Sequence, residues 1–225
     1  DLILLALIQR LALCVERGKV DRNFPYPPDM KDSDGASELT TLLLETGESA
    51  NSILKRGLMV GMDTVGAKFA NGQAFIPELL VAAKAMNAAM VHLKPYFESG
   101  EAKHRGSIVI GTIQGDLHDI GKNIVGMVLK GAGWNVIDLG SNVSADKFIT
   151  ALRDNNCKLA ALSALLTTTM LNMESVVGEI KGAITGSMVF IGGAPLSNEF
   201  SDKIDADGYF PDPHTFSKYL STLNT

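Results

Sequence analysis

This chain has few of the residues that form disulfide frameworks, metal clusters or nucleic-acid surfaces. Its 225 residues include two cysteines, one tryptophan and four histidines. Cys14 and Cys157 lie far apart with no metal-ligand spacing around either, so we expect two reduced thiols. With 20 basic against 25 acidic side chains, a net charge of −5 and no basic stripe, the sequence argues against nucleic acid as a partner.

Apolar runs long enough to cross a membrane are also missing. The most hydrophobic stretch, residues 1–14, is interrupted by Gln9 and Arg10, and it lacks the basic start and the small-residue cleavage site of a signal peptide. We therefore interpret it as a helix of the core. We expect a cytoplasmic protein with no membrane partner.

The first half of the chain has the periodicity of helices only. Apolar residues recur at helical spacing over 2–17, 37–46 and 49–65, and again from Pro77, which suits a first helical turn, to about Phe97. A proline-rich polar loop at 23–35 excludes any regular element there. Four helices with short connections predict an all-α bundle over residues 1–98, followed by a linker at 99–103.

The second half alternates between short apolar strands and helices. The strands are expected at 107–112, 135–139, 159–164, 188–191 and 208–210, and the helices at 121–130, 145–155, 170–181, 198–203 and 215–220. Such alternation indicates βαβ units and a parallel sheet covered on both faces. We therefore predict an α/β domain of the Rossmann or flavodoxin-like type over residues 104–225.

A histidine lies on the loop that follows the first predicted strand. His118 precedes a helix for which Asp119 is the candidate N-cap, and ligands bind at this end of the strands in open α/β sheets. A histidine here can donate one ring nitrogen to a metal, while Asp116 can hold the other nitrogen. Gly121 leaves the backbone open to a bulky group. A loop histidine capped by an aspartate is the alternative that these residues leave open.

Two further loops are expected at the same edge of the sheet. Residues 162–170 follow the third strand and contain Ser163 and three threonines, and Gly192 and Gly193 follow the fourth. A nucleotide-like tail lying between these loops would meet hydroxyl donors on one side and bare backbone on the other. Taken singly, the threonines could cap a helix and the glycines could form a turn. Their convergence with the histidine loop favours a ligand site.

The Asp-x-His-x-x-Gly pattern and the two loops together resemble the cobalamin domain of methionine synthase and of the small corrinoid proteins of methanogens and acetogens. The resemblance implies that His118 is the lower axial ligand to cobalt. It further implies that Asp116 is the hydrogen-bond partner of His118, and that Thr169 completes a relay in which the family has serine. The cofactor would be cobalamin, as methylcobalamin or as a Co(I) corrinoid. The other implied cofactor contacts are Asp119, Gly121, Ser163, Thr167, Gly192 and Gly193, with Ser163 and Thr167 on the displaced dimethylbenzimidazole tail.

The helical half carries a second resemblance. Residues 61–86 look like the cap bundle that covers the methyl face of methylcobalamin in methyltransferases. By that resemblance Phe69, Ile76 and Leu79 lie over the upper face of the cobalt, where an apolar lid keeps water and oxygen away. Packing in the bundle core explains most of this stretch. It explains Phe69 less well, because we expect that residue on a loop beside Asn71 and Gly72.

The family resemblance implies a methyl carrier that is not catalytic alone. A substrate:corrinoid methyltransferase would load the methyl group, and a corrinoid:acceptor methyltransferase would pass it to tetrahydrofolate or a thiol. A reductive activase would be a third partner. The sequence leaves the donor open between methoxylated aromatics, as in an O-demethylase system, methanol, methylamines and glycine betaine.

Three other functions compete with the carrier. A cobalamin-dependent light or ligand sensor would need an attached DNA-binding domain, and the cobalamin subunit of a mutase has no four-helix cap. A flavodoxin-like nucleotide binder would use the same sheet without cobalt.

Overall fold

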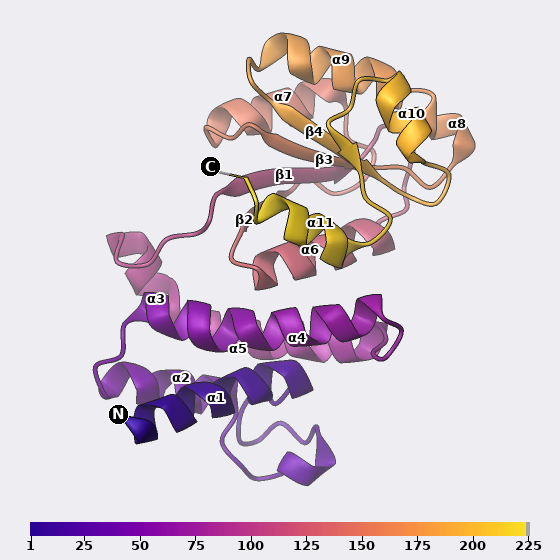
Figure 1. Cartoon of the computed structure of the whole chain (residues 1–225). Coiled ribbons are helices and arrows are strands. Elements are labelled where there is room, and N and C mark those ends of the chain that lie inside the picture. The colour runs from indigo at the N-terminus through magenta and orange to yellow at the C-terminus, as the bar shows by residue number, and fades with distance from the viewer. Residues whose placement is uncertain (224–225) are drawn as a thin grey trace. The chain divides into compact units, whose positions relative to one another are not determined.

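The structure, a computed structural model that describes residues 1–223, divides into two compact units. One unit consists of residues 1–104 with 131–133, and the other runs from Arg105 to Lys130 and from Trp134 onward. Figure 1 shows helices alone in the first unit and a sheet with helices in the second. This is the predicted combination of an all-α bundle with an α/β domain.

The helical unit follows the predicted order of helices. Its elements are α1 (Leu2–Arg17), η1 (Pro28–Met30), α2 (Ala36–Glu45), α3 (Ala50–Ser52), η2 (Ile53–Leu58), α4 (Met59–Ala70) and α5 (Ile76–Ser99). α1 ends because Gly18 adopts a left-handed conformation, with φ 76°, and its N–H caps the carbonyls of Cys14 and Val15. α5 begins with Pro77 in its first turn, as expected.

Two expectations for the helical unit are wrong. The helix expected at 49–65 contains a π-helical segment, η2, and its last part, α4, continues to Ala70, so Phe69 lies in the last turn of α4 and not on a loop. The backbone explains the extension, because the N–H of Asn71 still bonds to the Ala67 carbonyl at 3.0 Å. The loop at 23–35 does contain a regular element, the 3₁₀ turn η1, for which the fixed φ of Pro28 is suited.

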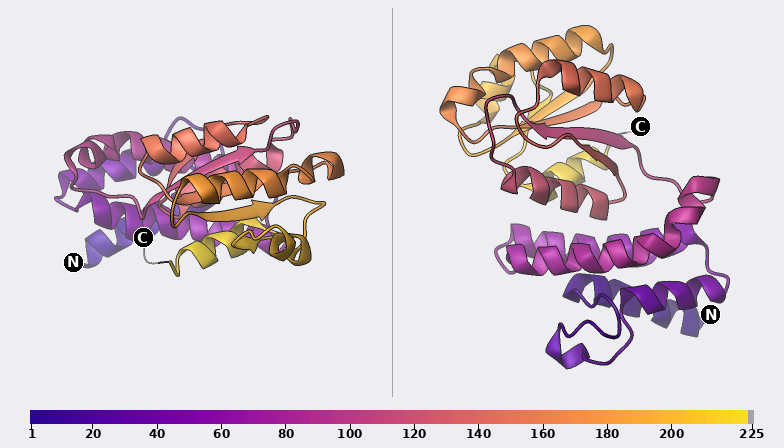
Figure 2. Two further views of the ribbon diagram at one scale, coloured as in Figure 1. Left: turned by 90° about the horizontal axis from the view of Figure 1, so that it is seen from above. Right: turned by 180° about the vertical axis from the view of Figure 1, so that it is seen from behind.

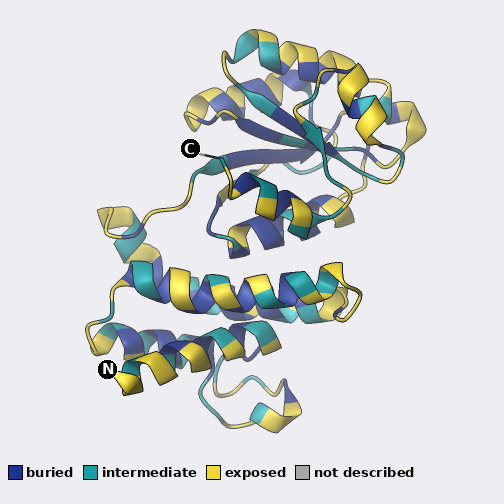
Figure 3. Cartoon of the chain, in the orientation of Figure 1, coloured by how far each residue is buried: buried dark blue, intermediate teal, exposed yellow. Residues whose placement is uncertain are grey.

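Close helix packing forms the core of the helical unit. α5 contributes buried residues at helical spacing, among them Leu79, Ala82, Met86, Ala89 and Leu93. Figure 3 shows the buried residues of the chain in dark blue. α1 approaches η2 and α4 where Gly57 and Gly61 lie one turn apart. A Cβ on Gly61 would come within 2.4 Å of the Ala12 carbonyl oxygen, so only glycine permits this approach.

The α/β unit contains one parallel sheet of five strands in the order β2-β1-β3-β4-β5. The strands are β1 (Ser107–Thr112), β2 (Asn135–Asp138), β3 (Leu159–Ser163), β4 (Met188–Gly192) and β5 (Gly208–Tyr209). The helices are α6 (Ile120–Gly131), α7 (Ala145–Asp154), α8 (Thr167–Met170), α9 (Met173–Ala183), α10 (Asn198–Lys203) and α11 (Pro213–Leu220). In Figures 1 and 2, α6 and α11 cover one face of the sheet, and α7 and α9 cover the other.

The strand order reverses between β1 and β3. From β1 the chain passes to β2 on one side, and from β3 it passes to β4 on the other. Ligands bind at such a switch point because the loops leave in opposite directions and open a crevice. Here the loop at 113–119 follows β1, and the loop at 164–166 follows β3.

Neither cysteine forms a disulfide, as expected. Cys14 and Cys157 are buried free thiols, and burial raises the pKa of Cys14 to about 11. Among residues 1–223, no helix combines the length and the hydrophobicity that a membrane span requires.

We expect Gly61→Ala to destabilise the helical unit by about 1–3 kcal/mol, because the added methyl group must displace the backbone of α1. Thermal unfolding followed by circular dichroism measures the change. Gly178→Ala in α9 is the matched control. A Cβ there meets no atom within 4 Å, so this helical substitution should be neutral or stabilising by about 0.5–1 kcal/mol. Equal unfolding midpoints for Gly61→Ala and the native chain would refute the packing argument.

Candidate functional site

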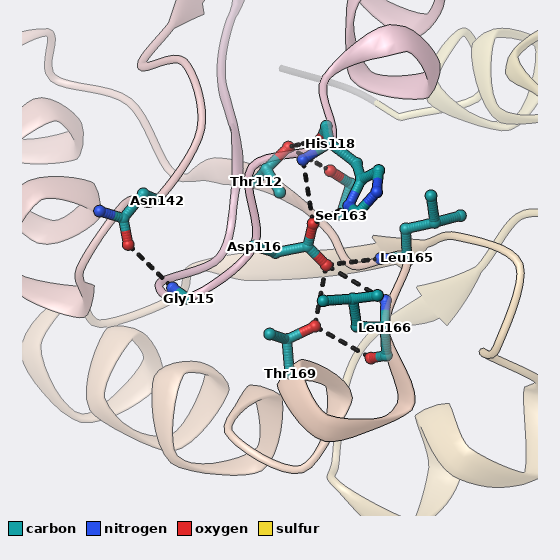
Figure 4. Close-up of polar contacts among 9 residues, drawn as sticks. All are labelled: Thr112, Gly115, Asp116, His118, Asn142, Ser163, Leu165, Leu166 and Thr169. Atoms are coloured by element: carbon teal, nitrogen blue, oxygen red, sulfur yellow. Dashed lines mark hydrogen bonds and ion pairs between the residues drawn. The ribbon is translucent and has the colours of Figure 1, made fainter.

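A buried carboxylate organises the loops at the switch point. Asp116 is fully buried, and its Oδ1 accepts hydrogen bonds from the backbone N–H and the ring Nδ1 of His118, at 3.0 and 2.8 Å. Its Oδ2 accepts from the amides of Leu165 and Leu166, at 2.8 and 3.2 Å, and from the Thr169 hydroxyl at 2.8 Å. Figure 4 shows these bonds converging from two loops. One side chain thus ties the loop after β1 to the loop after β3.

These hydrogen bonds determine the charge state of Asp116. Burial alone would raise its pKa, because a carboxylate loses hydration in the interior. The donated bonds from Leu165, His118 and Thr169 outweigh burial and hold the pKa of Asp116 well below its usual range. Asp116 is therefore a carboxylate at neutral pH, and it acts only as an acceptor toward its neighbours.

The imidazole of His118 is bound to Asp116 on one side and exposed to solvent on the other. Its side chain is 52% exposed although its partner Asp116 is completely covered. Because Nδ1 donates to the carboxylate, the proton of the neutral ring resides on Nδ1, and Nε2 keeps its lone pair. The carboxylate behind the ring also fixes the orientation of the imidazole. The geometry therefore suits Nε2 as a ligand to a metal.

Thr169 is the third residue of the predicted relay, after His118 and Asp116. Its hydroxyl lies 2.8 Å from Asp116 Oδ2 and 2.9 Å from the Leu166 carbonyl oxygen. The methyl group that distinguishes threonine from serine lies beside Gly115, where a Cβ would come within 3.4 Å of it. Gly115 has φ 90°, which favours glycine there. Threonine therefore keeps the hydroxyl position that the relay requires.

Sequence reasoning missed two residues that hold this loop. Thr112, the last residue of β1, is fully buried, and its hydroxyl contacts the His118 carbonyl and the Ser163 hydroxyl, each at 2.8 Å. Asn142, on the loop after β2, accepts from the Gly115 N–H through Oδ1 at 2.8 Å and donates its own N–H to the Asp116 carbonyl at 2.9 Å. Gly140-Ser141-Asn142 after a predicted strand was the available signal, since such residues form turns at strand ends.

An ion pair between a buried lysine and an exposed aspartate fixes the helix that follows the histidine. Lys122, in the first turn of α6, is 5% exposed, and its Nζ lies 2.8 and 2.7 Å from the two carboxylate oxygens of Asp138. The same Nζ also donates to Asn123 Oδ1. Asp138 ends β2 and accepts from the Gly140 N–H. The start of α6 is thereby anchored to the neighbouring strand.

The remaining sequence-predicted residues of this unit differ in their surroundings. Asp119 and Gly121 are exposed, and a Cβ on Gly121 would meet no atom within 4 Å, so the backbone there is open to a ligand. Thr167 is exposed in α8, which occupies part of the expected loop 162–170. Gly193 has φ 138° and touches the chain's own Ala164, whose carbonyl oxygen would be 1.8 Å from a Cβ. This backbone contact explains Gly193 without a ligand.

The predicted lid residues belong to the helical unit. Phe69 is half-buried near the end of α4, Ile76 is 39% exposed at the start of α5, and Leu79 is fully buried in α5. Phe75, which the sequence analysis did not select, is 64% exposed just before α5. Phe69, Phe75 and Ile76 are therefore better placed to meet a ligand than Leu79. The lid role of all these residues stays a prediction.

Comparison with known proteins assigns both units to one class of protein. A family model described as a B12 binding domain matches residues 106–216, and a second model with the same description matches residues 31–94. The first match covers the sheet and the His118 loop, and the second covers most of the helical unit. Both units therefore match domains of vitamin B12-binding proteins.

Its relatives define the family more closely. The chain is 40% identical over 182 residues to trimethylamine corrinoid protein 1 of Methanosarcina mazei, covering 79% of this chain and 84% of that protein. It is 40% identical over 162 residues to dimethylamine corrinoid protein 1 of Methanosarcina acetivorans, covering 71% and 76%. The chain belongs to the family of corrinoid proteins, and its cofactor is cobalamin or a related corrinoid.

Solved structures agree with this assignment. The methanol:cobalamin methyltransferase complex of Methanosarcina barkeri matches with a TM-score of 0.79 and 27% identity, over 96% of this chain and 78% of that one. A cobalamin-binding protein from Desulfitobacterium hafniense matches with a TM-score of 0.68 and 30% identity, over 82% and 88%. The predicted family, fold class and cofactor are confirmed.

The residues at the switch point fit a corrinoid. Nε2 of His118 is the nitrogen left for a metal, and the open backbone at Gly121 leaves room for a large ring. Leu117, Ile120 and Leu165 around the histidine are 73%, 68% and 45% exposed, an apolar surrounding that a flat macrocycle can cover. We therefore keep His118 as the proposed lower ligand.

We expect Asp116→Asn to lower the free energy of unfolding of the cofactor-free protein by about 1–3 kcal/mol at pH 7, because an amide cannot accept from all the donors. The pKa of Asp116 is lowered in the folded state, so its ionised form stabilises the fold fully above the ordinary carboxyl pKa. That contribution is lost as the pH falls through the folded-state value. The difference between the native chain and the variant should therefore shrink below about pH 4.

Thermal unfolding midpoints measured from pH 7 down to pH 3 test this expectation. Asp119→Asn is the matched control, because Asp119 is an exposed aspartate on the same loop and its substitution should change the midpoint little. A difference for Asp116→Asn that stays constant across this pH range would show that the carboxylate charge is not what the donors stabilise.

Proposed function

We propose that this corrinoid protein carries a methyl group between two methyltransferases. The observation that supports the proposal best is the exposed His118, whose Nδ1 is held by the buried carboxylate of Asp116. This arrangement occurs in a chain that resembles methylamine corrinoid proteins over about four-fifths of its length, with 79% covered. The bound corrinoid supplies a cobalt that accepts and releases the methyl group.

His118 and its partners would control the lower side of the cofactor. Nε2 of His118 would bind the metal, with the Nδ1 proton on the hydrogen bond to Asp116. If Nε2 carried no metal, it would be free to hold a proton, and the carboxylate of Asp116 would stabilise the charged ring. The Thr169 hydroxyl keeps one hydrogen bond on Oδ2 throughout, so the carboxylate does not turn away.

The relatives suggest the class of methyl donor. Two of them are named for trimethylamine and dimethylamine, and the structural relative is a complex with a methyltransferase for methanol. We infer that the first partner is a methyltransferase for a methylated amine. A carrier that is loaded must also be unloaded, so the second partner is a corrinoid:acceptor methyltransferase that uses tetrahydrofolate or a thiol. A reductive activase is the third partner, which keeps the corrinoid reduced. The alternative of a light or ligand sensor has no support from these relatives.

The helical unit would protect the reactive side of the cofactor. Phe69 and Ile76 are apolar and partly accessible, and Phe75 is largely exposed. Such side chains can exclude water and oxygen from a bound cofactor when they cover it. A partner methyltransferase then needs this cover to move aside, as lids do in other enzymes.

Reconstitution and methyl transfer test the carrier function. The chain, loaded with hydroxocobalamin and chemically reduced, is mixed with methyltransferases for trimethylamine, dimethylamine or methanol, each with its own substrate. We expect methylation of the bound corrinoid, seen in its absorbance spectrum, to be at least about tenfold faster with a methylamine enzyme than with the methanol enzyme.

His118→Ala is the accompanying variant. It should bind the cofactor without a protein-derived nitrogen on the metal, whereas the native chain should show His118 in place of the cofactor's own base. A native chain that binds cobalamin but accepts no methyl group from any of the three enzymes would exclude the proposed donors. Identical spectra for the native chain and His118→Ala would exclude the ligand assignment.

We expect Phe69→Ala to accelerate oxidation of the reduced, cofactor-loaded protein several-fold in air, because the variant removes apolar cover from the cofactor. Stopped-flow absorbance measures the rate. Val91→Ala is the control, since Val91 is a 69% exposed apolar residue of α5 outside the predicted lid. The lid role is wrong if both variants oxidise at the native rate.

A further inference from the structure

The buried hydroxyl of Thr112 contacts two neighbours but has a single hydrogen to donate. Its side chain is fully buried, so solvent cannot reach it. Oγ1 donates to the backbone carbonyl of His118 at 2.8 Å, and the same oxygen lies 2.8 Å from the Ser163 hydroxyl. Figure 4 shows Thr112 and Ser163 side by side beneath His118. The two hydroxyls and the carbonyl form one short chain.

Counting hydrogens fixes the direction of these bonds. A hydroxyl donates one hydrogen, and Thr112 gives its hydrogen to His118. The bond between the two hydroxyls must then be donated by Ser163, so Ser163 presents only lone pairs to a ligand. If Ser163 instead donates to a ligand, Thr112 must turn its hydrogen toward Ser163 and leave the His118 carbonyl. Otherwise two oxygens face each other at 2.8 Å with no hydrogen between them.

We propose that Thr112 is a positioning residue that couples the ligand contact of Ser163 to the backbone of the axial histidine. A ligand that places a hydrogen-bond acceptor beside Ser163, such as the ring nitrogen of a displaced base, takes the hydrogen of Ser163. Thr112 then donates its own hydrogen to Ser163, and the His118 carbonyl loses its donor. A ligand without that acceptor leaves the hydrogen bond from Thr112 to the His118 carbonyl in place. The inference deepens the proposed function and rests on it, because it assumes that His118 binds a corrinoid metal.

The coupling has two opposite consequences. Removing the Thr112 hydroxyl frees the His118 carbonyl and weakens the hold on the histidine, most of all for a corrinoid that places no acceptor on Ser163. Without the Ser163 hydroxyl, Thr112 has only the His118 carbonyl to donate to, so that hydrogen bond persists with every cofactor. The nucleotide tail of cobalamin loses the hydrogen bond from Ser163. A structural role for Thr112 alone would not make these two variants differ in sign.

Two cofactors separate the effects. Cobalamin carries the nucleotide tail, and cobinamide lacks it. The variants are Thr112→Val, which keeps the branched shape, Thr112→Ser, which restores the hydroxyl, and Ser163→Ala. Ser201→Ala is the control, because the Ser201 hydroxyl is buried and has no hydrogen-bond partner among residues 1–223.

The readouts are the dissociation constants for both cofactors and the electron paramagnetic resonance of their Co(II) forms in protein labelled with ¹⁵N-histidine. A doublet from ¹⁵N reports His118 on the metal, and a triplet from ¹⁴N reports the cofactor's own base. These measurements do not depend on methyl transfer.

For Thr112→Val we expect a smaller doublet fraction, with the larger decrease for cobinamide, and about a fivefold loss of cobinamide affinity, the effect of one hydrogen bond. Thr112→Ser should restore both. Ser163→Ala should weaken cobalamin about fivefold, leave cobinamide unchanged, and keep or increase the doublet fraction. Ser201→Ala should behave as the native chain.

Three outcomes would overturn the inference. The first is a doublet fraction in Thr112→Val equal to that of the native chain. The second is a Thr112→Ser variant whose doublet fraction and affinity are lowered as much as those of Thr112→Val. The third is a loss of the doublet in Ser163→Ala. If the native chain binds neither cofactor or shows no ¹⁵N doublet, the proposed function fails instead, so the two failures are distinguishable. Circular dichroism spectra of the variants establish that each is folded.

Discussion

The hydrogen bonds to Asp116 are the interaction on which the site depends. A carboxylate in the interior is unfavourable unless donors surround it, and here they come from its own loop and from the loop after β3. Satisfying that charge requires both loops to adopt one conformation. The requirement also orients the imidazole, because Nδ1 of His118 is one of the donors. Stability of the loops and the direction of Nε2 therefore have the same cause.

The sheet supplies the place for this carboxylate. The order β2-β1-β3-β4-β5 sends successive connections to opposite sides, so the loops after β1 and β3 border one crevice. The loop after β2 contributes as well, since Asn142 binds the backbone of Gly115 and Asp116. Three connections thus meet at the end of β1. The comparisons attach a corrinoid to this fold, and the polar network explains how such a fold can present a single nitrogen to it.

Much of this arrangement could be predicted from the sequence. Strand and helix periodicity located the sheet, and the pair Asp116 and His118 with its glycine indicated both the site and the cofactor. Thr112 escaped notice because a threonine at a strand end is compatible with strand propensity alone. Its role depends on the approach of His118 and Ser163, which are distant in sequence. Phe69 was placed on a loop because Asn71 and Gly72 beside it are typical turn residues, although α4 ends only at Ala70.

The anchors on either side of the histidine limit how far it can travel. Asp116 is held by its donors, and buried Lys122 is held by both carboxylate oxygens of Asp138, so residues 117–121 connect two anchored points. A tether this short lets the imidazole rotate about its own side-chain bonds but gives the backbone little room to withdraw. Detachment of His118 from a metal would therefore be a swing of the ring, and the ring would remain close enough to return.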